Sequence, residues 1–231
     1  MGRQLKGLLY FFIMDLRYSL LIFWTILLGI LVSGLAFAYF LTGVDGDTNF
    51  IFFLNIPMYV YAAIVGYLTV RDFMPFSIKM GATRKNMFIA IGIFFFLISV
   101  AKSLIGTVLQ ELVESFNAFA GIDIFTFLHF AHLLENNWYT RMIIDTTMIF
   151  FFFMVMLLIR LLVHRFGLLG SGSVLGVLAV LLLVAVARGW VFDFFRELFA
   201  AFEVGIFYQV FGIGLLLYLI SFLFIKRIEV K

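Results

Sequence analysis

The sequence predicts an all-α, polytopic membrane protein, and three observations lead to that class. Of the 231 residues, 65% are hydrophobic, with 33 Phe among the aromatic residues, and only 13% are charged. Several apolar runs reach the roughly 20 residues that a helix needs to cross the hydrocarbon core of a bilayer. The short alternating segments of a membrane barrel do not occur, so helices are the way to satisfy the backbone in lipid. The chain length favours one domain, residues 1–231.

The chain begins with an amphipathic stretch, followed by the apolar runs. Over residues 1–18, basic residues alternate with large apolar ones, which predicts an interfacial helix; the alternative is that this stretch extends the first span. Residues 188–204 mix aromatic and charged residues at helical spacing, which predicts a helical segment on the outer surface. The apolar runs predict six transmembrane helices, at Ser19–Leu41, Phe50–Val70, Met87–Gln110, Met142–Val163, Leu168–Ala187 and Gly205–Ile225.

Lys and Arg are unevenly divided among the connectors between these spans. Alternate connectors carry opposite net charges. The positive ones are residues 1–18, 71–86, 160–167 and 226–231, and the negative ones are residues 43–50, 111–141 and 188–203. Because cytoplasmic connectors carry the excess of Lys and Arg, both termini are expected to be cytoplasmic.

The most basic connector, residues 71–86, makes up most of the stretch RDFMPFSIKMGATRKNMF, residues 71–88. Pro75 can begin a short helix, Gly81 permits a turn, and Thr83 is a candidate N-cap for the next helix. The two faces of the short helix would carry Phe76, Met80 and Thr83 on one side and Lys79 and Arg84 on the other. A half-apolar, half-basic helix predicts a docking element; the alternative is a solvated turn whose charges anchor the chain.

The phrase MPFSIKMGATRKNMF in this connector resembles the loop that follows the second span in ABC-transporter permeases of the type-2 exporter class. The chain length, the lead-in helix, the six expected spans and the two cytoplasmic ends agree with that class. The resemblance implies that the loop is a coupling helix, which docks into a cleft of an ATPase subunit, and that residues 188–204 form a re-entrant hairpin. The implied docking residues are Phe73, Phe76, Lys79, Met80, Thr83, Arg84 and Lys85.

The resemblance also implies the partners. The sequence has no Gly-x-x-x-x-Gly-Lys-Ser/Thr loop to cradle phosphates, so ATP and Mg would bind to a partner ATPase and this chain would not be an enzyme. A second permease half, identical or a sister chain, is expected as well. The expected function is export of a hydrophobic or amphipathic molecule, such as a peptide, an antimicrobial or a lipid-like compound, across a bacterial plasma membrane. The alternatives are a non-transport immunity, sensor or scaffold subunit and an intramembrane hydrolase.

Two charged residues lie inside expected spans. Lys102 falls in the third span and Asp145 near the outer end of the fourth. Because an intramembrane charge is costly and tends to find a partner or line a cavity, we expect a structural ion pair between them, with a substrate-path role as the alternative.

The remaining polar motifs do not predict catalysis. His129 and His132 are spaced to share one helical face, but Glu135 is rotated away, so we predict an interfacial helix there and no metal site. Ser171 lacks the Gly-x-Ser-Gly pattern of intramembrane serine proteases, and the small residues around it favour helix packing. The chain has no cysteine, which excludes disulfides and thiol nucleophiles. Its basic residues form no continuous stripe, so no nucleic-acid partner is expected.

Overall fold

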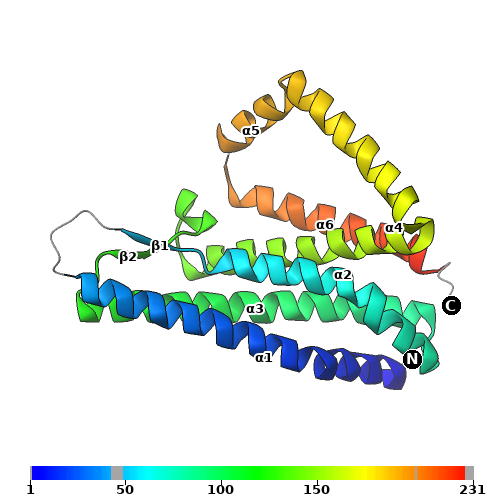
Figure 1. The fold of residues 1–231 in the computed structure, drawn as a ribbon, viewed down its shortest axis with the longest axis horizontal. Coiled ribbons are helices and arrows are strands. Elements are labelled where there is room, and N and C mark those ends of the chain that lie inside the picture. Colours follow the sequence, from blue (N-terminus) through cyan, green and yellow to red (C-terminus); the bar gives the residue numbers. More distant parts are fainter. Residues whose placement is uncertain (1, 43–48, 201, 227–231) are drawn as a thin grey trace.

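The computed structural model describes residues 2–42, 49–200 and 202–226, and these residues form six α-helices. Helices α1, α2, α3, α6 and the first part of α4 lie side by side in an elongated bundle (Figure 1). The elements in order are α1 (Gly2–Leu41), β1 (Phe50–Phe52), α2 (Asn55–Lys79), α3 (Arg84–Ala120), β2 (Phe125–Phe127), the 3₁₀ helix η1 (Phe130–Leu133), α4 (Trp138–Ala187), α5 (Trp190–Ala200) and α6 (Val204–Ile225).

Within the described residues, α1, α3, α4 and α6 are long and apolar enough to cross a membrane. The all-α class is therefore confirmed, and these helices indicate a membrane protein. Helix α2 does not meet the same criterion, although residues 50–70 were expected to form a span. The first residues of the expected span form β1 instead of helix, and the tyrosines of α2, together with Arg71 and Asp72, reduce the mean hydropathy of α2.

Helix α1 combines two segments that were predicted to form separate helices. Residues 1–18 were expected to form an interfacial helix apart from the span at residues 19–41, but α1 runs unbroken for 40 residues. No proline or turn sequence separates the two stretches, so nothing ends the helix between them. At 1.5 Å per residue α1 is about 60 Å long, roughly twice the hydrocarbon thickness. Its first turns also pack in the core, where Phe12 is fully buried.

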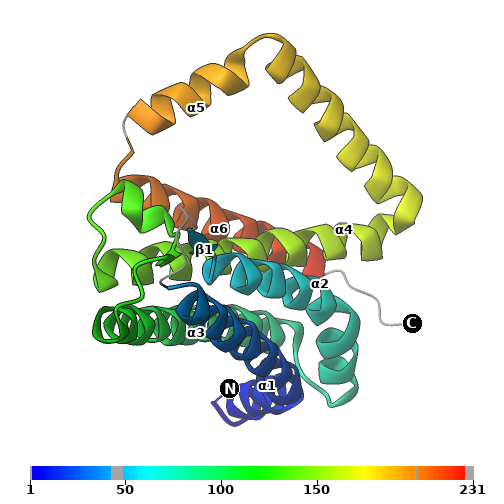
Figure 2. The ribbon, with the colours of Figure 1, turned by 60° about the vertical axis from the view of Figure 1, so that its left-hand side comes forward.

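The corner between α2 and α3 differs from the expected short helix. Helix α2 continues through Pro75 to Lys79, and its last turns bend away from the rest of the helix (Figure 2). A proline inside a helix removes one backbone hydrogen bond and causes such a bend. Gly81 then turns the chain with a φ of 80°, a conformation that favours glycine. Thr83 caps α3 as predicted, since its side chain accepts a hydrogen bond from the Asn86 N–H (3.3 Å).

Helix α4 changes direction at Gly167, whose φ of 71° and ψ of −179° lie outside the helical range. Residues 138–166 lie in the bundle, whereas the second arm, residues 168–187, diverges from it (Figure 1). Helix α5 then returns the chain to α6. The second arm is apolar around its whole circumference and mostly exposed, which is the pattern of a helix surrounded by lipid or by another apolar protein surface.

A small cap closes one end of the bundle. Strands β1 and β2 pair in parallel, with Phe50 opposite Phe125, and α3 extends ten residues past its expected end at Gln110 before Gly121 terminates it. The interfacial helix expected around His129 is wrong: that segment contains β2, η1 and extended chain. Pairing with β1, which the local sequence does not reveal, holds this segment in a non-helical conformation.

Close helix packing defines the core beneath this cap. A Cβ atom added at Gly66 of α2 would lie 2.6 Å from the Phe153 carbonyl oxygen of α4, so only glycine allows this approach. The Phe153 ring stacks on Phe95 of α3 at a centroid distance of 4.3 Å. The first arm of α4 therefore lies at the centre of the bundle, in contact with α2, α3 and α6.

Candidate functional site

The α2–α3 corner, the start of α1 and the end of α6 meet at one end of the bundle. Gln4 Nε2 donates a hydrogen bond to the Gly81 carbonyl oxygen (2.9 Å). Arg84 Nη1 donates to the Lys226 carbonyl oxygen (2.8 Å). The Phe11 ring stacks on Phe76 with a centroid distance of 4.5 Å. We call this region, the corner with the segments bound to it, the basic end.

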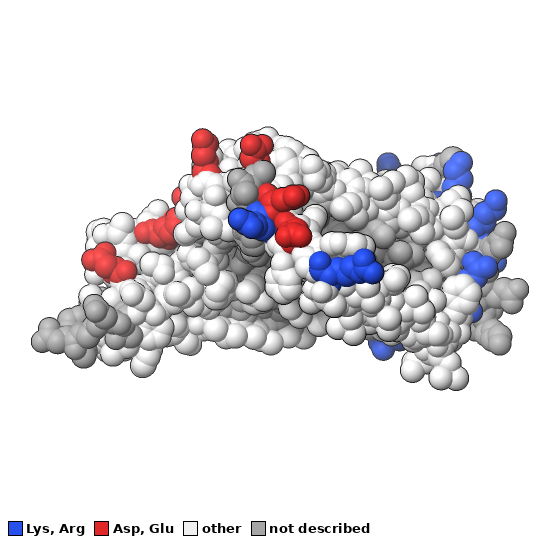
Figure 3. All heavy atoms as spheres, turned by 90° about the horizontal axis from the view of Figure 1, so that it is seen from above, with Lys and Arg blue, Asp and Glu red and all other residues white. Residues whose placement is uncertain are grey.

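The name follows from the charge distribution. On the face that Figure 3 shows, most Lys and Arg side chains lie at one end of the molecule, a few lie near its middle, and Asp and Glu side chains lie mainly over the other half. The expected docking residues occupy the basic end, where the exposed ones are Phe76, Lys79, Met80, Thr83, Arg84 and Lys85. Exposed apolar groups beside exposed cations form a surface suited to a protein partner with acidic and apolar groups.

Phe73 does not belong to this surface. Its side chain is 5% exposed, and its ring stacks on Phe12 of α1 at a centroid distance of 5.2 Å. Because α2 continues through Pro75, Phe73 keeps the inward direction that the helix gives it. The prediction that Phe73 contacts a partner is therefore wrong, and its role is to pack α2 against α1.

The expected pair between Lys102 and Asp145 is also wrong. Lys102 lies on the side of α3 that faces α1 and α2, not α4. Its amino nitrogen is 3.6 Å from the centroid of Tyr61 and 3.8 Å from that of Phe23, and the side chain is 1% exposed. This nitrogen has no hydrogen-bond partner among the described residues. Two aromatic faces, not a carboxylate, therefore surround it.

Asp145 instead joins three elements of the structure. Its Oδ1 atom accepts a hydrogen bond from Tyr59 Oη of α2 (2.5 Å) and lies 3.1 Å from Nε2 of His129. His129 Nδ1 accepts from the Ala131 N–H (2.9 Å), so Nε2 carries a hydrogen and donates it to Asp145. All three side chains are buried. We call Tyr59, His129 and Asp145 the buried polar network.

The sequence alone did not reveal this network. Asp145 was correctly identified as a buried charge that needs a partner, but its partners lie 86 and 16 residues away in the chain. The available signal was His129, in the connector before the fourth expected span, and it was interpreted as part of an interfacial helix.

A second charged cluster ties the ends of α3 and α4 together near the cap. The buried guanidinium of Arg141 donates to Glu111 (3.0 Å) and to Glu114 (3.3 Å), and its Nε atom donates to Asn136 (2.7 Å). The pKa of His132 is lowered from its ordinary 6.5. The largest cause is partial burial of its ring, and the second is the positive charge of Arg141. In the described part of the chain, no group of three or more His, Asp or Glu side chains is arranged to hold a metal.

Ser171 shows no sign of activation as a nucleophile. Its hydroxyl donates to the Gly167 carbonyl oxygen one turn earlier (2.7 Å), next to the change of direction in α4. A hydroxyl that bonds the backbone of its own helix in this way is occupied locally.

The setting of Lys102 gives a testable prediction about stability. Replacing Lys102 with methionine is expected to leave the free energy of unfolding unchanged or to raise it by about 1–3 kcal/mol, because methionine keeps the apolar stem and removes an amino group that is costly to bury. Unfolding of the purified protein in detergent measures this change. A lower stability of the Lys102→Met protein would contradict the prediction and show that the contacts with Phe23 and Tyr61 outweigh the cost of burial.

Comparison of the chain with family models, with curated proteins and with solved structures finds no match.

Proposed function

We propose that this chain is the membrane-spanning subunit of an ATP-driven exporter of the type-2 ABC class, and that a separate ATPase docks on its basic end. The observation that carries the proposal is the α2–α3 corner. Its side chains Phe76, Lys79, Met80 and Lys85 are exposed, yet its backbone is bonded to α1 and its Arg84 to the end of α6. The corner is therefore an exposed surface that is bonded to two further helices.

These connections suggest how ATPase closure would be transmitted. Movement of the corner acts directly on α2 and α3, reaches α1 through Gln4 and Phe11, and reaches α6 through Arg84. Packed helices tend to shift as units between discrete arrangements. The helices around the first arm of α4 would therefore rock together and open a path across the membrane.

The proposed topology has six spans with both termini in the cytoplasm of a bacterium. Helices α1, α2, α3 and α6 provide four, and the two arms of α4 provide the others. The gathering of Lys and Arg at the basic end supports a cytoplasmic location for that end (Figure 3). The exposed apolar second arm of α4 supports contact with lipid or with a second permease half. A hydrophobic or amphipathic cargo fits such surfaces better than a polar solute does.

Co-purification tests the central claim. The chain, carrying an affinity tag on a long C-terminal linker that keeps the tag away from the basic end, is extracted from its native membranes in mild detergent. We expect a soluble ATPase with a phosphate-binding loop to be recovered with it, together with ATP hydrolysis that stops when Mg is chelated. Recovery of the intact chain without any ATPase would contradict the proposal and favour a non-transport subunit.

A further inference from the structure

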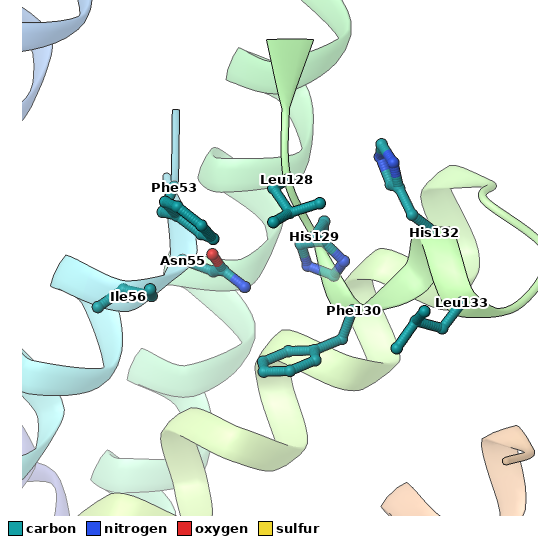
Figure 4. Close-up of a pocket in the computed structure, with 8 residues that line it drawn as sticks. All are labelled: Phe53, Asn55, Ile56, Leu128, His129, Phe130, His132 and Leu133. Carbon is teal, nitrogen blue, oxygen red and sulfur yellow. The ribbon is translucent and has the colours of Figure 1, made fainter. Parts of the chain in front are cut away.

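A cavity opens beside the buried polar network, between the start of α2 and the segment that leads into η1. Its volume is about 220 Å³. The walls are mostly apolar and come from Phe53 and Ile56 on one side and from Leu128, Phe130 and Leu133 on the other (Figure 4). The residues that line it include no Lys, Arg, Asp or Glu.

One residue that lines this cavity, Asn55, has a buried polar atom without a partner among the described residues. Asn55 is 2% exposed, and its Oδ1 atom makes no hydrogen bond within the part of the chain that the structure describes. Its Nδ2 atom is 3.4 Å from Tyr59 Oη, at the edge of the buried polar network. Figure 4 shows the Asn55 amide among the residues that line the cavity. A buried acceptor without a donor costs free energy, which a ligand with a donor would recover.

The histidines of the cavity do not supply this donor. Both ring nitrogens of His129 are engaged, Nδ1 by the Ala131 N–H and Nε2 by Asp145. His132 is exposed, and the lowering of its pKa favours the neutral form of its ring. The cavity therefore offers an apolar, uncharged environment with one buried acceptor.

We propose that this cavity binds a small uncharged amphiphile, an apolar ring or chain that carries one O–H or N–H group, which donates to Asn55 Oδ1. The size is appropriate, because a dry cavity of about 150 Å³ binds benzene and this larger one accommodates a fused pair of rings. A charged ligand is excluded because the walls would strip its hydration and provide no counter-charge. The site goes beyond the proposed transport function and does not depend on an ATPase.

The experiment compares two probes of nearly the same shape, 2-naphthol, which has a donor, and 2-methoxynaphthalene, which has none. The full chain is reconstituted in lipid nanodiscs, and equilibrium dialysis measures the probe retained in excess of protein-free nanodiscs. We expect saturable binding of 2-naphthol at one site and about tenfold weaker binding of the methoxy analogue, as the loss of one buried hydrogen bond predicts.

Two variants locate the site. Asn55→Leu keeps the side-chain volume and removes the acceptor, so it is expected to bind both probes equally weakly. Leu128→Trp fills the cavity and leaves Asn55 in place, so saturable binding of 2-naphthol is expected to disappear. Leu219→Trp, at an exposed position of α6 far along the chain, is the matched control and is expected to bind as the natural chain does. Equal affinity for the two probes, or unchanged binding to Leu128→Trp, would overturn the proposal.

Discussion

Replacing Asp145 with alanine is expected to lower the free energy of unfolding by about 3 kcal/mol. The substitution removes the acceptor that Tyr59 and His129 share, and it leaves their O–H and N–H groups buried without partners. Each unsatisfied buried group costs about 1–3 kcal/mol, while the loss of a buried carboxylate recovers part of its own desolvation cost. The net loss is large because α2, α4 and the segment before η1 all depend on this one side chain.

Asparagine at the same position is the matched control. Asp145→Asn keeps an oxygen acceptor in the same place, so its loss of stability is expected to be less than half that of Asp145→Ala. Reversible unfolding of the purified protein in detergent, followed by circular dichroism, measures both changes. Equal losses in the two variants would show that the negative charge, not hydrogen bonding, gives Asp145 its importance.

The contribution of Tyr59 to stability can be measured in the same way. Tyr59→Phe removes only the hydroxyl that donates to Asp145. Residues that share a hydrogen bond give non-additive effects, so this substitution should cost less in the Asp145→Ala background than in the natural chain. Additive losses would show that the two side chains act independently.

The local features of the fold were accessible from the sequence. The turn at Gly81 and the cap at Thr83 depend on residues within a few positions of each other, and both were predicted correctly. The long apolar helices were accessible for the same reason, because hydropathy is a local property. Gly167, where α4 changes direction, lies in the short gap predicted between the fourth span, which ends at Val163, and the fifth, which begins at Leu168.

The predictions that were wrong concern features that depend on contacts between distant segments. Lys102 and Asp145 were assigned to each other because neighbouring spans were expected to face one another, but the rotation of α3 turns Lys102 towards Tyr61. The segment around His129 was expected to be helical, yet its conformation follows from the pairing of β2 with β1. Neither helix rotation nor strand pairing is encoded in a short stretch of residues.

Function is the least accessible level, because both sites consist of residues from several elements. The basic end combines the α2–α3 corner, which the sequence identified, with Gln4 and Lys226 at opposite ends of the chain, which it did not. The cavity beside Asn55 requires residues of the segment after β2, whose fold was predicted incorrectly. The sequence could therefore indicate a membrane protein with a basic corner, but not the hydrogen bonds that join this corner to α1 and α6.

Reversing two charges at the basic end is expected to abolish coupling to the ATPase. In the variant Lys79→Glu/Lys85→Glu, both altered side chains are exposed, so the fold and the amount of protein in the membrane should remain as in the natural chain. Like charges placed against an acidic partner surface cost several kcal/mol, and we expect an affinity for the ATPase about a hundredfold lower. Arg84 is left intact because it bonds the Lys226 carbonyl oxygen, and its loss would also loosen α6.

The measurement is ATP hydrolysis by the complex reconstituted in lipid vesicles, compared with the ATPase subunit alone. The natural chain is expected to stimulate hydrolysis, and the double variant is expected to leave it at the level of the isolated ATPase. Arg196→Glu, at an exposed position of α5, is the control for charge reversal elsewhere on the chain and should stimulate normally. Stimulation by the double variant equal to that by Arg196→Glu would show that the ATPase docks on another surface, because no comparable change at a true interface leaves coupling intact.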